Sequence, residues 1–241
     1  MKVSNIVKNK IDRLESGFVF TYDCFDLRAD QISALKKVLS RMVKSGKIRK
    51  LSKGKFYKPK KSQFGELSPD TYQVVKDLLE KDGKVIGYIT GISIYNKLGL
   101  TTQVYNTIQI GVNREKKAIQ RGIYKVKFIK QPNKITKENI PLLRILDSIR
   151  NIKNIPDTTV EASCIRLKAI INELELRDQE KLIKLVLKYN PATRAMFGAI
   201  IEKANNNLNT DAIYQSLNPA TIYSFNITEK ILPNREKWFI K

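Results

Sequence analysis

The sequence predicts an α+β protein, and two observations carry this prediction. In several segments apolar residues recur every three or four positions, as in amphipathic helices, while shorter segments alternate apolar and polar residues, as in strands. Charge is also uneven along the 241 residues, with 17 basic and 5 acidic side chains in residues 1–62, 13 and 6 in residues 63–137, and 15 and 12 in residues 138–241. We therefore expect one domain at 1–62 and a second at 63–241, whose first part is mixed α/β and whose last part is mainly helical.

The first three elements are short. Residues 6–14 show helical periodicity, with Ser4 as the expected N-cap and Ser16-Gly17 as the end. Residues 18–20 then predict a short strand, and residues 22–27 predict a short helix.

The next helix is predicted over residues 32–43, with Asp30 as its cap and Ser45-Gly46 as its end. Its apolar residues fall within one face at about 100 degrees per residue. The opposite face carries polar and basic side chains, which are Ser33, Lys37, Ser40, Arg41 and Lys44.

A hairpin should follow this helix. Residues 47–51 alternate charged and apolar side chains, residues 52–54 provide a turn whose glycine allows a positive φ, and residues 55–57 return before Pro59. Helix, strand, helix, helix and hairpin are, in this order, the elements of a winged helix-turn-helix. In that fold the second helix of the motif enters the major groove of DNA and the hairpin contacts the flanking backbone.

Basic residues in this region are free of acidic neighbours in the sequence. The stretch 31–65 holds twelve Lys or Arg and no Asp or Glu. Such an excess of positive charge favours binding to a polyanion, because neutralising its phosphates releases counterions. A surface that only keeps a protein soluble normally mixes both signs of charge, and a disordered tail lacks this apolar periodicity. We therefore expect double-stranded DNA as a partner. The helix residues named above would face the groove, with Arg41 as the best candidate for a bidentate contact to guanine, and the phosphate contacts would come from Arg49, Lys50, Lys53 and Lys55.

Beyond the hairpin, residues 60–67 predict a linker, and Ser68-Pro69 should start a helix that ends at Asp82-Gly83. Apolar stripes from residue 140 onward predict four helices, and the last 25 residues look extended or irregular. Between these parts we expect three strands, at residues 84–89, 105–113 and 122–130. A short helix is expected at residues 92–98, between the first two strands.

Several classes of function are disfavoured. The chain contains no histidine, the commonest general base and zinc ligand, and it has no Walker or Gly-x-Gly-x-x-Gly motif, so we expect neither enzymatic activity nor a cofactor or metal. Cys24 and Cys164 are expected to be small core residues. A membrane surface would attract the same positive charge. However, no stretch reaches the roughly 18 to 20 apolar residues that span a bilayer, and residues 1–13 lack the core of a signal peptide, which predicts a soluble cytoplasmic protein.

Two alternatives compete with duplex binding. Pro69-Asp70 and Glu115-Lys116-Lys117 spell the pattern of a magnesium-dependent nuclease, but Asp70 suits the start of a helix and Glu115 a polar turn. Aromatic residues beside basic ones can stack single-stranded bases. Their alternation along strands favours the core of the first domain instead, and they are Phe18, Phe20, Phe56 and Tyr57.

Three segments carry a family resemblance. Residues 35–51 with 54–59, the run LKYNPATRAMFGAIIE at 187–202, and Leu217-Asn218-Pro219 occur in the order found in AbiEi-like antitoxins, and the chain resembles that family. These proteins are the antitoxins of bacterial type IV toxin-antitoxin (abortive infection) pairs.

The resemblance implies a winged helix that binds operator DNA, with inverted repeats, and represses its own operon. It further implies that the C-terminal domain counters a nucleotidyltransferase toxin, with or without a stable complex. Tyr189 and Arg194 flank an apolar helix and are candidate contacts, although Arg194 equally suits a local cap or pair. The alternative is a stand-alone winged-helix regulator whose helical domain serves dimerisation or sensing.

Overall fold

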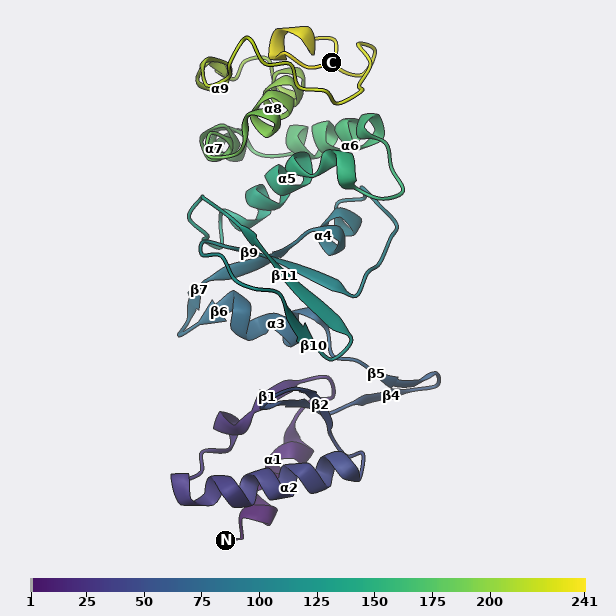
Figure 1. Ribbon diagram of the computed structural model, residues 1–241, viewed down its shortest axis with the longest axis vertical. Helices are drawn as coiled ribbons and strands as arrows, with labels where there is room; N and C mark the ends of the chain where they lie inside the picture. The colour runs from purple at the N-terminus through teal and green to yellow at the C-terminus, as the bar shows by residue number, and fades with distance from the viewer. Residues whose placement is uncertain (1) are drawn as a thin grey trace. The chain divides into compact units, whose positions relative to one another are not determined.

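The computed structural model describes residues 2–241 and confirms the α+β class (Figure 1). The chain divides into two compact units. One takes the chain up to Leu78 together with Ala118–Val126, and the other takes Leu79–Lys117 and Lys127–Lys241. The first unit thus continues past residue 62 and includes a segment distant in sequence.

Helices and a small sheet build the N-terminal part of the first unit, in the order expected from the sequence. The sheet has the strand order β1-β3-β2 and is antiparallel, with Val19 and Arg49 both opposite Tyr57. The elements are α1 (Val3–Arg13), β1 (Val19–Thr21), the 3₁₀ helices η1 (Tyr22–Phe25) and η2 (Ala29–Gln31), α2 (Ile32–Lys44), β2 (Arg49–Ser52) and β3 (Lys55–Tyr57).

The core of this unit lies between the two helices and the sheet. Phe20 and Phe56 are buried there with their ring centroids 6.0 Å apart, which confirms that these two aromatic residues support the core. Phe18 packs against the same core, and Tyr57 is half-buried. The other buried members are Val7, Ile11, Phe25, Leu35, Leu39 and Ile48.

Local signals were correct at one end of α2 and wrong at two other helix starts. Ser4 lies inside α1 rather than at its cap. Asp30 lies within η2, where its carboxylate accepts a hydrogen bond from Arg28 at 3.2 Å and caps nothing. Gly46, with φ +75°, ends α2 as predicted, because its left-handed backbone allows the Lys47 N–H to reach the Met42 carbonyl at 3.0 Å.

The segment 60–67, which we expected to be a linker, is a β-hairpin. Strands β4 (Lys60–Ser62) and β5 (Gly65–Leu67) pair with each other and with no other described strand, and they project from the unit (Figure 1). No apolar alternation marks this hairpin, so its pairing could not be read from periodicity.

Two further elements complete the first unit. Helix α3 (Thr71–Leu79) begins three residues after Ser68, the expected cap, and the Asp70 carboxylate instead accepts a hydrogen bond from the Tyr72 N–H at 2.8 Å. The helix also ends before the predicted Asp82-Gly83, which lies in the turn of a short strand pair. Strand β10 (Ile119–Arg121) pairs antiparallel with the first residues of β11 (Tyr124–Lys130).

In the second unit, β8 (Gly87–Thr90) and β9 (Thr107–Val112) are antiparallel, and β11 adjoins β9. With the short pair β6 (Glu80–Lys81) and β7 (Lys84–Val85) and the helix α4 (Ile92–Lys97), they confirm the predicted mixed region. The four predicted helices are also present, as α5 (Ile140–Arg150), α6 (Val160–Asn172), α7 (Leu176–Val186) and α8 (Pro191–Ala204), followed by the shorter α9 (Asp211–Gln215); the 3₁₀ helices are η3 (Ile152–Asn154) and η4 (Glu236–Trp238).

Helix α8 is the centre of the second unit. Every residue from 195 to 201 is buried, and the C-terminal segment folds back so that Trp238 packs on Gly198. A parallel bridge between Tyr223 and Ile240 ties that segment together. Within the described part of the chain, each helix is too short or too polar to cross a bilayer.

Candidate nucleic-acid interface

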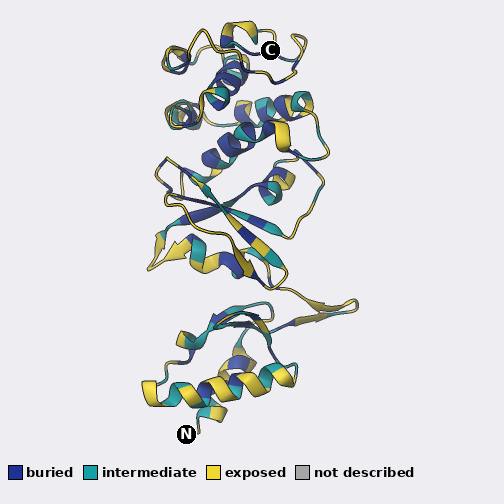
Figure 2. Cartoon of the chain, in the orientation of Figure 1, coloured by how far each residue is buried: buried dark blue, intermediate teal, exposed yellow. Residues whose placement is uncertain are grey.

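Helix α2 presents one polar face to solvent, and Figure 2 shows exposed positions alternating with buried ones along it. Leu35 and Leu39 are fully buried on the inner face, so rotating the helix would bury charge. All five groove-facing residues predicted for this helix are exposed, namely Ser33, Lys37, Ser40, Arg41 and Lys44.

The sequence reasoning missed one cation on this face. Lys36 is exposed, and its ammonium lies 5.7 Å from the centre of the Tyr22 ring. By contrast, the side chains of Lys37, Arg41 and Lys44 form no hydrogen bond or ion pair with any of residues 2–241. These three charges are therefore available to a ligand.

The four basic residues of the β2–β3 hairpin that were predicted to contact phosphate fall into two groups. Lys50 and Lys53 are exposed and have no ion-pair partner among the described residues. Arg49 instead donates to both carboxylate oxygens of Glu66, and the Lys55 ammonium lies 3.0 Å from the Asp77 carboxylate. Only the first two are free to bind phosphate without breaking an existing pair.

Asp77 joins three segments of the first unit. Its carboxylate accepts two hydrogen bonds from Arg121, at 2.6 and 2.8 Å, in addition to the contact with Lys55. Arg121 is almost fully buried and also donates to the Val74 carbonyl at 2.6 Å. Partial burial of Asp77 opposes its ionisation, but the hydrogen bonds from Arg121 and Lys55 outweigh that effect and hold its pKa below the usual value.

Folding brings acidic side chains from other segments next to several basic residues of the stretch 31–65. Asp12 pairs with Lys47 at 2.6 Å, in the same way that Glu66 and Asp77 pair with Arg49 and Lys55. Lys58 donates to two carbonyls in the α1 region. The cations of the stretch that keep no such partner within residues 2–241 are Lys36, which lies over the Tyr22 ring, and Lys37, Arg41, Lys44, Lys50, Lys53, Lys60 and Lys61.

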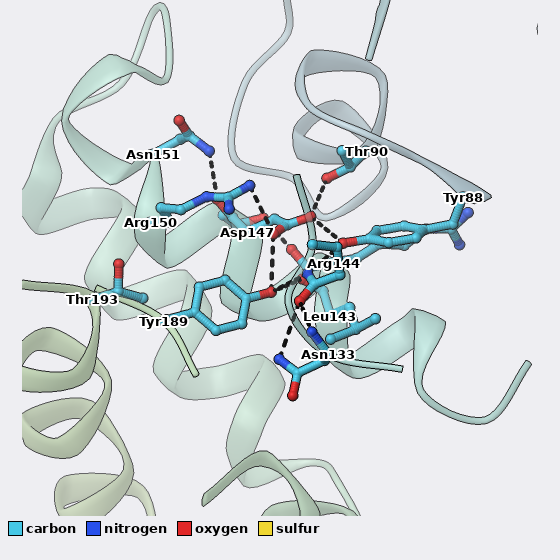
Figure 3. A network of polar contacts seen from close by, with 12 residues as sticks. Tyr88, Thr90, Asn133, Leu143, Arg144, Asp147, Arg150, Asn151, Tyr189 and Thr193 are labelled. Carbon is cyan, nitrogen blue, oxygen red and sulfur yellow. Dashed lines mark hydrogen bonds and ion pairs between the residues drawn. The ribbon is translucent and has the colours of Figure 1, made fainter. Parts of the chain in front are cut away.

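A different polar site lies inside the second unit, around the carboxylate of Asp147 (Figure 3). Tyr88 and Thr90 donate to Oδ2 at 2.7 and 2.8 Å, and Tyr189 donates to Oδ1 at 3.0 Å. The Arg150 guanidinium forms an ion pair with Oδ1 at 3.1 Å. This set links β8, α5 and the turn between α7 and α8 through one buried carboxylate.

Two amides surround these hydroxyls. Gln131 donates to the oxygens of both Tyr88 and Tyr189, at 2.9 and 2.8 Å, and Asn133 donates to Gln131 and to the Leu185 carbonyl. Burial raises the pKa of the Tyr88 and Tyr189 hydroxyls, as does the charge of Asp147, so both remain donors. Burial likewise raises the pKa of Asp147, opposed by Arg150 and the hydroxyl hydrogen bonds.

Tyr189 and Arg194, the residues proposed from the sequence to contact a partner, differ in exposure. Tyr189 is buried with its hydroxyl in the network, so it presents no surface in this conformation. Arg194 is half-buried, and its Nε has no hydrogen-bond partner among the described residues. Asn190 caps α8 by accepting from the Thr193 N–H at 2.9 Å. Much of the segment 187–202 therefore serves the fold.

The residues of the nuclease pattern have other contacts. Asp70 starts α3, as described above, and Glu115 lies 3.3 Å from the Lys130 ammonium. In the described ranges, no three His, Cys, Asp or Glu side chains gather as potential metal ligands. Cys24 packs against the first core; Cys164 is buried in the second, which raises the pKa of its thiol to about 11.

A family model described as a family of unknown function, DUF6088, matches residues 6–182. The search of curated proteins found no match.

Proposed function

Because the chain belongs to the DUF6088 family, whose function is unknown, we propose a function from the structure and sequence of the chain itself. The N-terminal part of the first unit is a winged helix-turn-helix that binds duplex DNA. The whole protein is an antitoxin of a type IV toxin-antitoxin pair that represses its own operon and has no catalytic activity.

Topology supports the winged helix. The elements α1, β1, η1, α2, β2 and β3 follow one another in the order of that fold, and the sheet order β1-β3-β2 brings the hairpin beside the first strand. In this proposal α2 is the helix that enters the major groove and the β2–β3 turn is the wing.

The observation that carries DNA binding is the set of cations without partners on α2 and the wing. Lys37, Arg41 and Lys44 lie on one side of α2, and Lys50 and Lys53 lie on the wing. A guanidinium at Arg41 suits the O6 and N7 atoms of guanine, whereas lysines suit phosphate. The geometry thus supports one residue that reads sequence and several that provide affinity.

The antitoxin role rests on the resemblance to AbiEi-like proteins. In this proposal the first unit binds operator DNA with inverted repeats, and the second unit counters a nucleotidyltransferase toxin encoded beside the gene. The buried Asp147 network gives the second unit a defined arrangement of β8, α5 and the turn between α7 and α8. A stable complex with the toxin is not required.

DNA binding is tested by titrating the full chain against a duplex from upstream of its own gene, and against a random duplex, at several salt concentrations. Replacing Lys37, Arg41 and Lys44 together by alanine should weaken binding to both and lower the salt slope by about three units. The matched control removes the same charge from exposed positions of the α7 region, with Arg177→Ala, Lys184→Ala and Lys188→Ala. Equal losses for the two triple variants, or no binding by the wild type, would contradict the proposal.

The antitoxin role is tested by co-expression with the adjacent gene, scored by growth. Rescue by the full chain is expected, and absence of rescue would overturn this role. DNA binding without rescue would instead indicate a stand-alone regulator.

A further inference from the structure

The β4–β5 hairpin carries the most exposed large apolar side chain among those described. Phe64, in the turn of this hairpin, is 98% exposed. We call residues 60–67 the arm. Its strands pair through Lys60 with Leu67, Lys61 with Glu66, and Ser62 with Gly65, and no other strand of residues 2–241 adjoins them. Single exposed apolar side chains are common on protein surfaces, but this ring lies in the turn of a separate two-stranded hairpin.

The turn of the arm is held in one conformation. The Ser62 hydroxyl donates to the Gly65 carbonyl at 2.8 Å and accepts from the Phe64 N–H at 3.2 Å. Gly65 has φ +108°, which only glycine adopts readily. These contacts place Phe64 at the tip of an ordered hairpin, and its ring has no core to enter.

The base of the arm lies beside the C-terminal end of α2. Arg49 binds Glu66 of β5 through two hydrogen bonds. The same guanidinium also approaches Gly46, where a Cβ would lie 3.4 Å from its Nη1. Gly46 lies two residues after Lys44, so the base of the arm is close to the last turn of α2, which carries Arg41 and Lys44.

The charge of the arm indicates its partner. Lys60 and Lys61 are exposed and unpaired within residues 2–241, and the negative charge of Glu66 is neutralised by Arg49. A second copy of this chain, with its own net charge of +22, would repel such an element. A polyanion would attract it, and in duplex DNA an apolar side chain can also insert between base pairs.

We propose that the arm enters the minor groove next to the major-groove site of α2, and that Phe64 inserts between two base pairs and bends the duplex. This inference rests on the proposed DNA binding. Lys60 and Lys61 contact the phosphates on either side of the groove.

The test measures affinity and bending with the full chain and a duplex carrying a fluorophore at each end. Wild-type protein should shorten the end-to-end distance. Phe64→Ala should abolish this bend and weaken binding about tenfold without changing the salt slope, because the lost contact carries no charge. Phe64→Leu should keep most of the bend, since leucine also inserts between bases. Gln63→Ala, a neighbouring exposed position in the same turn, is the matched control.

Failure of this inference can be separated from failure of the proposed function. If Phe64→Ala binds and bends the duplex as the wild type does, insertion is overturned while DNA binding stands. If Phe64→Ala instead dissociates a dimer of the free protein, the tip is a contact between copies and the inference is also overturned. If the wild type binds no duplex, both proposals fall.

Discussion

The guanidinium of Arg49 donates hydrogen bonds of 2.7 and 3.0 Å to the two carboxylate oxygens of Glu66. This pair joins β2 to the arm and removes one positive charge from a stretch whose own sequence has no acid. Both side chains are a third or more exposed, so the pair contributes at most about 1 kcal/mol to stability.

Glu66→Gln should therefore free Arg49 for phosphate. We expect tighter binding to any duplex and a salt slope steeper by about one unit, with little change in the free energy of unfolding. Binding titrations at several salt concentrations and chemical denaturation measure the two quantities. Glu180→Gln removes an equal charge from the exposed surface of α7. The same increase in slope for both variants would show a general charge effect and contradict the specific one.

Replacing Arg41 and replacing Lys53 should affect DNA binding in different ways. Arg41→Ala should cost about 1–3 kcal/mol of discrimination between operator and random duplex, because a bidentate contact to guanine is lost. Lys53→Ala should weaken both duplexes equally and lower the salt slope by about one unit. An equal loss on both duplexes for Arg41→Ala would refute its role in reading sequence.

Asp77 should make stability depend on pH. Its pKa in the folded state lies below the unfolded value, so its stabilising effect is complete above the unfolded value of about 3.9 and is lost as the pH falls through the folded pKa. Asp77→Asn should lower the free energy of unfolding by about 1 kcal/mol near pH 7. The effect is small because Asp77 is partly exposed and solvent screens its ion pairs. The difference from wild type should vanish in acid. Denaturation of both proteins from pH 7 to pH 2 tests this, and a difference independent of pH would contradict it.

The Asp147 network should respond strongly to loss of its charge. Tyr189→Phe removes one hydrogen bond to a buried carboxylate and should cost about 2 kcal/mol of unfolding free energy. Asp147→Asn leaves Arg150 without its buried partner and should cost about 3 kcal/mol or more. Tyr105→Phe, at an exposed tyrosine of the same unit, is the control and should change stability little. Similar losses for the two Tyr→Phe variants would show that the network is not the cause.

Gly198 should reverse the usual effect of alanine in a helix. Alanine normally stabilises a helix interior by about 1 kcal/mol relative to glycine. At Gly198, however, a Cβ would lie 2.1 Å from Cζ3 of Trp238, which is fully buried. Gly198→Ala should therefore destabilise by about 3 kcal/mol. Adding Trp238→Leu should cost less in the Gly198→Ala background than in wild type, and strictly additive effects in this double-mutant cycle would contradict the steric explanation.

Elements with strong local periodicity could be predicted from the sequence. The apolar spacing of α2 and of the helices from α5 to α8 matched the structure, and the glycines at 46 and 54 marked turns because both need a positive φ. The sequence did not predict that the arm is a hairpin. Its strands are defined by backbone pairing and by the contacts of Ser62, and neither produces a pattern of apolar residues in the sequence.

The sequence alone determined the amphipathic character of α2, which side of it is charged, and the excess of cations around it, since these depend on residues close together in the chain. Only the tertiary structure decided which of those cations are free. Asp12, Glu66 and Asp77 lie outside the stretch 31–65, yet they neutralise Lys47, Arg49 and Lys55 within it. Ion pairs depend on distances in space, whereas the composition of a segment reports only its neighbours along the chain.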